Sequence, residues 1–234
     1  MKIGIISSFG RSFWEYLKIS SEIGIKYLEL WSYPGYWKPL TIGYTIEGIY
    51  NLWPVGGFPP EYADPATGMP SLELKEKIES YGMEVTSFYH KNDFLITDQA
   101  KLEYEVKRIR DLCNTLNKWG VEVARVHGGE ARNTLVWNIS FEKSIELIVE
   151  GFKRCIKYAE DAGVYLAIEN HGHILQDSDT LIRILREVNS DHLGVTVDTG
   201  NFIAYGHRPE TVKKNLKELA PYTLNTHIKD GKEN

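Results

Sequence analysis

The chain has 234 residues, 42% of them hydrophobic, and a formal net charge of −5. This length and composition suit one domain over residues 1–234 with a substantial core, and the dispersed basic residues lack the stripe that is typical of nucleic-acid binding. Because the N-terminal apolar run is shorter than a signal peptide's hydrophobic region and no later run approaches a membrane span, we expect a cytoplasmic protein that binds no membrane. The missing basic stripe predicts that it binds no nucleic acid either.

Short runs rich in apolar and β-branched residues alternate along the chain with stretches of helical periodicity. Such runs are typical of buried parallel strands. We predict strands at about residues 2–7, 26–31, 84–90, 122–128, 164–170, 193–198 and 224–229. Their alternation with helices predicts an α/β fold, either an open doubly wound sheet or a closed barrel.

Glycine follows four of the predicted helices, where the chain turns back into a strand. A glycine at this position adopts a left-handed conformation without a Cβ penalty, so its recurrence predicts a repeated helix-to-strand unit. The four are Gly24, Gly82, Gly120 and Gly163. Cys113 and Cys155 fall on the apolar faces of predicted helices, where buried free thiols are more common than a disulfide or a nucleophile.

Polar side chains stand near the C-terminal ends of six predicted strands. They are Glu29, His90, His127, Glu169, Asp198 and His227. A barrel gathers the C-terminal ends of many strands round one mouth, whereas an open sheet uses one switch point. The pattern therefore predicts a TIM barrel. The aromatic-rich residues 32–70 lack helical periodicity, and we expect them to form a long loop over that mouth, as a lid or as a contact in a homo-oligomer.

Glu169, Asp198 and His227 each end an apolar run, and each lies 29 residues from the next. Two carboxylates and an imidazole from successive strand ends suit a hard-to-borderline divalent cation. Because burying two carboxylates without a cation is costly, we predict a metal site. The remaining candidates are predicted to be structural or turn residues: His171, His173, His192, His207 and Asp230.

Three motifs, Ala-Ile-Glu169-Asn-His, Thr-Val-Asp198-Thr-Gly-Asn and Thr-His227-Ile-Lys-Asp, occur in this order on successive predicted strands. Together they resemble those of the sugar phosphate isomerase/epimerase family, the xylose-isomerase-like TIM barrels. The resemblance implies that these three numbered residues hold a divalent cation, often manganese, although magnesium, cobalt and zinc also suit such ligands. It also implies that His90 and His127 face the hydroxyls of a sugar or sugar phosphate.

In that family a fourth ligand, a glutamate, lies on an eighth strand, and it has no counterpart before Asn234. Seven strands do not close a standard eight-stranded barrel. We therefore expect the eighth β/α unit to lie outside the sequence shown. The alternative is a site completed by water or by another chain.

By this resemblance the reaction is the isomerisation or epimerisation of a sugar, which removes a proton next to a carbonyl and passes through an enediolate. A divalent cation offsets the charge on the enediolate oxygen, and Glu169 is the predicted base. Lys229 alternates with His227 and so shares its face, where it would offer a cation to a substrate oxygen or phosphate. Glu29 is predicted to orient a histidine at the substrate site. For both Lys229 and Glu29 the alternative is a simple salt bridge.

Three other functions fit the same residues. An inosose-type dehydratase would use the same site and differ in the group that leaves after proton abstraction. A three-zinc abasic-site endonuclease would use His90 and His127 as further ligands, but Asn201 stands where that family has a histidine and the chain's charge is unsuited to DNA. The last alternative is a sugar-binding barrel without catalysis.

Overall fold

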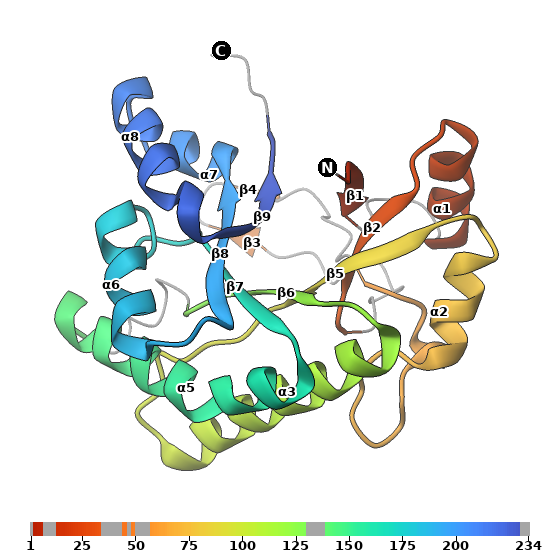
Figure 1. Cartoon of the computed structure of the whole chain (residues 1–234), viewed down its shortest axis with the longest axis horizontal. Coiled ribbons are helices and arrows are strands. Elements are labelled where there is room, and N and C mark those ends of the chain that lie inside the picture. The colour runs from red at the N-terminus through yellow and green to blue at the C-terminus, as the bar shows by residue number, and fades with distance from the viewer. Residues whose placement is uncertain are drawn as a thin grey trace. The chain divides into compact units, whose positions relative to one another are not determined.

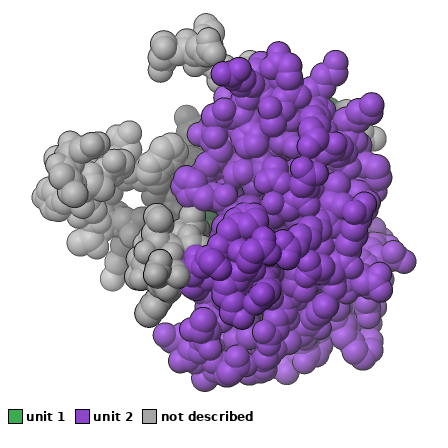
Figure 2. Space-filling view, turned by 90° about the vertical axis from the view of Figure 1, so that its left-hand side faces the viewer, with its two compact units in different colours: residues 1–89, 118–121 green, residues 90–117, 122–234 purple. Residues whose placement is uncertain are grey.

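The computed structural model describes residues 2–6, 13–33, 44–45, 48–49, 57–129 and 139–229. These residues fall into two compact units, coloured separately in Figure 2. The first unit comprises Met1–Tyr89 with Lys118–Val121, and the second comprises His90–Asn117 with Glu122–Asn234. The single domain over residues 1–234 stays a prediction.

The first unit contains three parallel strands in the order β1–β2–β5, with helices between them in sequence. Leu28 and Leu30 of β2 and Phe88 of β5 are buried, as predicted for apolar strands. Ser71 caps the start of helix α2, because its side chain accepts a hydrogen bond from the Leu74 backbone N–H. The bounds are β1 Gly4–Ile6, α1 Phe13–Glu22, β2 Tyr27–Trp31, β3 Tyr44–Thr45, β4 Gly48–Ile49, a 3-10 turn Pro60–Tyr62, α2 Leu72–Glu79 and β5 Glu84–His90.

The second unit contains four parallel strands in the order β6–β7–β8–β9. Helices α5, α6 and α8 lie next to one another, and all three contact β7 or β8 (Figure 1). The bounds are α3 Gln99–Trp119, β6 Val123–Val126, α5 Phe141–Ala162, β7 Tyr165–Glu169, α6 Ser178–Val188, β8 Leu193–Asp198, α7 Thr199–Ala204, α8 Pro209–Leu219, a 3-10 turn Ala220–Tyr222 and β9 Thr223–His227. Together the two units hold all seven predicted strands.

The predicted helix-to-strand junctions are confirmed at all four glycines. Gly24, Gly82, Gly120 and Gly163 have φ of 86°, 75°, 69° and 67°, in the left-handed region that favours glycine. Helix α5 shows how a whole unit is built: Ser140 caps its start, one apolar face is buried, and Gly163 ends it.

Both cysteines are free and buried, as the helical periodicity predicted. Burial raises the pKa of the Cys113 thiol to about 12, and burial likewise raises that of Cys155. Thiols held in the protonated form are poor nucleophiles and poor metal ligands, so the two cysteines serve the core.

Part of the predicted loop over residues 32–70 has structure. Strands β3 and β4 form an antiparallel pair, and further on Ala63 pairs with Pro70, with Phe58 and Met69 buried. Residues 34–43, 46–47 and 50–56 lie outside the described residues, so the lid or subunit contact stays a prediction. In the described ranges no helix is long and apolar enough to cross a membrane.

Candidate metal site

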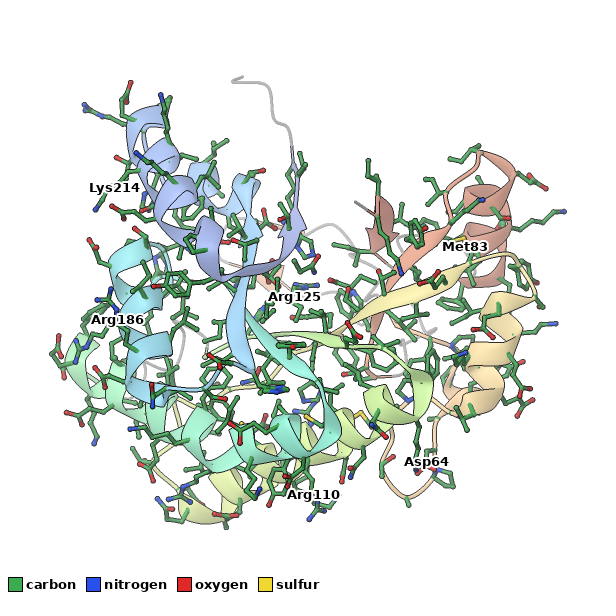
Figure 3. The ribbon with its side chains drawn as sticks, viewed as in Figure 1. Asp64, Met83, Arg110, Arg125, Arg186 and Lys214 are labelled. Carbon is green, nitrogen blue, oxygen red and sulfur yellow. The ribbon has the colours of Figure 1, made fainter. Side chains whose placement is uncertain are left out.

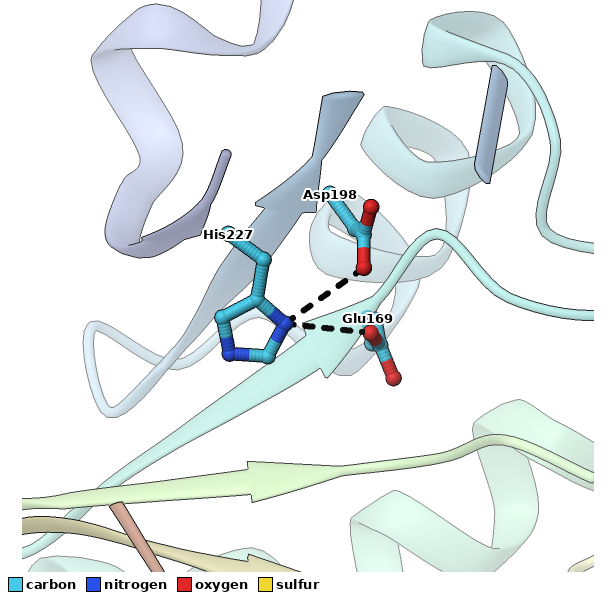
Figure 4. A group of neighbouring side chains, drawn as sticks. All are labelled: Glu169, Asp198 and His227. Carbon is cyan, nitrogen blue, oxygen red and sulfur yellow. Dashed lines mark ion pairs between the residues drawn. The ribbon is translucent and has the colours of Figure 1, made fainter. Parts of the chain in front are cut away.

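Glu169, Asp198 and His227 come together at the C-terminal ends of β7, β8 and β9. His227 Nδ1 lies 3.4 Å from Glu169 Oε1 and 3.5 Å from Asp198 Oδ2, as Figure 4 shows. Each residue offers one ligand atom, and these atoms all lie within 4.8 Å of one another. The structure thus assembles the three predicted residues, and their role as metal ligands stays a prediction.

The strand register explains why the three side chains meet. Glu169 lies opposite Thr196, and Asp198 lies opposite His227, so β7, β8 and β9 end close to one level. Asn170, the residue after Glu169, strengthens this alignment. Its Oδ1 accepts a hydrogen bond from the Asp198 backbone N–H at 2.6 Å, and its Nδ2 donates to the Asp198 carbonyl at 3.0 Å. One buried amide thereby joins the end of β7 to the end of β8.

Replacing Asn170 with alanine is expected to lower the free energy of unfolding by about 2 kcal/mol, because a buried N–H and a buried carbonyl at Asp198 would lose their partner. Urea unfolding followed by circular dichroism measures this change. Asn117 is the matched control, since its exposed amide donates one hydrogen bond to the Ala162 carbonyl at 2.9 Å. Equal effects of Asn170→Ala and Asn117→Ala would contradict the role assigned to Asn170.

The Glu169 carboxylate has two further partners on β6 and just beyond it. Arg125 donates to Oε2 at 2.7 Å, and His127 Nε2 lies 3.0 Å from the same oxygen. Burial by itself raises the pKa of Glu169, but the Arg125 guanidinium and the hydrogen bonds from His127 and His227 hold that pKa well below its ordinary value. Glu169 is therefore ionised at neutral pH although its side chain is only 2% exposed.

Arg125 was not among the residues that the sequence predicted for the site. Its side chain is 8% exposed, and in Figure 3 it lies among the strands, whereas Arg110, Arg186 and Lys214 extend from helices. The signal was present: an arginine alternates with His127 within an otherwise apolar strand, so the two side chains share a face.

The two oxygens of Asp198 have different surroundings. Oδ1 accepts hydrogen bonds from the backbone N–H groups of Gly200 and Asn201, at 3.0 and 3.2 Å, and so caps α7. Oδ2 lies 2.5 Å from Lys229 Nζ. Burial alone raises the pKa of Asp198, but hydrogen bonds from His227 and Lys229 lower it overall.

The donor set fits a divalent cation. Ligands must be deprotonated to bind a metal, and both carboxylates are kept ionised by their neighbours. Two carboxylate oxygens and one imidazole nitrogen suit manganese, magnesium, cobalt or zinc. Without a cation, Arg125 and Lys229 already offset the two negative charges.

The other histidines of the second unit divide into two groups. His90 and His127 are buried, and the His127 ring stacks on His171 with centroids 4.7 Å apart. Burial, then the charges of Arg108 and His127, hold the pKa of His90 well below its ordinary value, so His90 is neutral. The other three make contacts typical of structural residues: His173 with Tyr205, His192 with Val164 and Tyr165, and His207 with Phe202.

Two predicted residues remain, Glu29 and Asp230. Glu29 belongs to β2 in the first unit, where its carboxylate accepts a hydrogen bond from Ser87 at 3.0 Å. Its predicted role in orienting a histidine stays a prediction. Asp230 lies outside the described residues.

The model of the xylose isomerase-like TIM barrel family matches residues 41–234. The chain therefore belongs to this family, and the predicted barrel class is confirmed. Whether an eighth β/α unit lies outside the sequence stays a prediction.

One curated relative of this chain is distant in sequence. An uncharacterized protein of Methanocaldococcus jannaschii, MJ1311, is 22% identical over 189 residues, which cover 79% of this chain and 63% of that protein. The chain thus spans less than two thirds of this curated relative.

Solved structures are similar over nearly the whole chain. D-psicose 3-epimerase from Clostridium cellulolyticum H10, with D-tagatose, has a TM-score of 0.70 at 17% identity. The match covers 98% of this chain and 73% of the epimerase chain. The IolI protein with a bound zinc atom has a TM-score of 0.67 at 16% identity, and the match covers 99% of this chain and 74% of the IolI chain. At these identities the likeness shows the fold alone.

Proposed function

We propose that the chain is a divalent-metal-dependent isomerase or epimerase of a sugar or sugar phosphate. The convergence of Glu169, Asp198 and His227 at three neighbouring strand ends carries this proposal, because their ligand atoms meet and both carboxylates are ionised. Membership of the xylose isomerase-like family and the fold of D-psicose 3-epimerase support it. Manganese is the proposed cation, with magnesium, cobalt or zinc as alternatives. Cytoplasmic location and a homo-oligomer stay predictions.

The three ligands would hold a cation that, when bound, polarises the substrate carbonyl and offsets the charge of an enediolate. Glu169 is the proposed base. Because Arg125 keeps the pKa of Glu169 low, this carboxylate is a weak base and needs a substrate carbon whose own proton is acidified in the site. For substrate contacts we propose His90, His127 and Lys229, of which Lys229 has a half-exposed side chain.

Metal removal tests the proposal directly. Dialysis of the purified protein against EDTA is expected to lower its ketose 3-epimerase or isomerase activity by at least about 100-fold. Addition of Mn²⁺ should restore the activity. D-fructose, D-psicose, D-tagatose and their phosphates are the substrates, with products separated by chromatography. Inosose dehydration and abasic-site nicking are assayed in parallel. Activity that survives metal removal, or activity only in one of these parallel assays, would contradict the proposal.

A further inference from the structure

Two positively charged side chains of the chain touch the two carboxylates of the candidate metal site. Arg125 pairs with Glu169 Oε2, and Lys229 pairs with Asp198 Oδ2. Asp198 Oδ2 is also the oxygen that lies 3.5 Å from His227 Nδ1. The Lys229 ammonium is therefore ion-paired with the Asp198 oxygen that faces the imidazole, where a cation held by the three residues would bind.

The two positive charges differ in how firmly they are held. The Arg125 side chain is 8% exposed, whereas that of Lys229 is 53% exposed. The backbone of Lys229 is nevertheless anchored, because its N–H donates to Thr199 Oγ1 at 3.2 Å and its carbonyl accepts from the same hydroxyl at 3.4 Å. Lys229 thus has a fixed backbone and an ammonium that can turn toward solvent.

A glycine, Gly200, leaves space beside the Lys229 side chain. A Cβ atom at Gly200 would lie 2.7 Å from Lys229 Cβ, closer than carbon atoms approach without displacement. The first carbons of the lysine side chain thus pass over a residue that lacks a side chain, and Nζ reaches Asp198 from there. The contact depends on a glycine at one end and on a carboxylate at the other.

We propose that Lys229 is an internal counter-ion, which pairs with Asp198 while the site lacks a cation and is displaced when a divalent cation binds. This inference rests on the proposed function, since it takes the three residues to be metal ligands. A divalent cation has twice the charge of an ammonium, and two positive charges repel each other strongly at one carboxylate oxygen. Displacement frees the ammonium for an anionic oxygen of the substrate.

Displacement makes metal binding and substrate binding interdependent. Cation binding releases Lys229, and an anionic oxygen that then pairs with Lys229 stabilises the cation-bound state. By linkage, each ligand raises the affinity for the other by the same factor. Lys229 is thus a positioning residue in the metal-free protein and a proposed substrate contact in the metal-bound one.

Calorimetric titration of the metal-free protein with Mn²⁺ tests the proposal. Lys229→Met is expected to bind Mn²⁺ about tenfold more tightly than the natural sequence, because the cation no longer competes with an ammonium. The matched control is Lys214→Met, which removes an exposed lysine on α8 that pairs with Asp179 on α6 at 3.2 Å. We expect the control to bind Mn²⁺ with unchanged affinity.

Amine labelling gives a second measurement that does not depend on activity. Reductive methylation followed by mass spectrometry is expected to modify Lys229 several-fold faster once Mn²⁺ is added, with Lys214 unaffected. Unchanged or weaker Mn²⁺ binding by Lys229→Met, while the natural sequence binds Mn²⁺, would overturn the counter-ion role alone. If the natural sequence bound no divalent cation at all, the proposed function would be overturned as well.

Discussion

Arg125→Met is expected to lower the free energy of unfolding by about 3–5 kcal/mol, the largest stability effect of any single substitution in the site. The substitution leaves the ionised Glu169 carboxylate buried, 2% exposed, without the guanidinium that pairs with Oε2 at 2.7 Å. With the guanidinium gone, less of the desolvation cost of this buried charge is offset. Urea unfolding followed by circular dichroism, at pH 7 and without added metal, measures the change.

A matched arginine and a double variant separate the ion pair from the loss of an arginine as such. Arg110 on α3 is 43% exposed and pairs with its neighbour Asp111 at 3.4 Å, so Arg110→Met is expected to cost less than about 1 kcal/mol. Arg125→Met combined with Glu169→Met removes both charges and should recover part of the stability. If the double variant were no more stable than Arg125→Met, the buried pair would not explain the effect.

The sequence predicted the architecture well because local signals agreed with one another. Apolar runs predicted the strands, and left-handed glycines such as Gly163 marked where helices end. Polar residues at the ends of the apolar runs favoured a barrel over an open sheet. The equal spacing of Glu169, Asp198 and His227 reflects two successive β/α units of similar length. Each of these features depends on a short stretch of neighbouring residues, so the sequence alone reveals it.

The partners of the carboxylates could not be predicted so readily, because they depend on strand register. Arg125 lies opposite Ala167, so Glu169, two residues further on, lies on the same face of the sheet within reach of the guanidinium. Lys229 reaches Asp198 by the same geometry. It stands two residues after His227, the residue opposite Asp198, and so lies on the same face as His227. A shift of one residue in either pairing would turn these side chains to the other face.

Glu169→Gln is expected to reduce turnover of the best ketose substrate by at least about 1000-fold, because the variant lacks both the proposed base and one charged ligand. Arg125 would lose its counter-charge while keeping a carbonyl acceptor, so the free energy of unfolding should fall by about 1–3 kcal/mol. Steady-state kinetics in saturating Mn²⁺, below the unfolding temperature of the variant, measure turnover. Glu187→Gln is the matched control, since this exposed glutamate pairs only with Arg183 on α6 among the contacts described.

Mn²⁺ affinity of the same variant separates the two roles proposed for Glu169. A ligand without a catalytic role would weaken Mn²⁺ binding, and a sufficient Mn²⁺ concentration would then restore turnover. A base without a role in coordination would leave Mn²⁺ affinity near that of the natural sequence while turnover stayed low. We expect both losses together, because Oε1 faces His227 Nδ1 at 3.4 Å while Oε2 is fixed by Arg125. Wild-type turnover in Glu169→Gln would remove Glu169 from the mechanism.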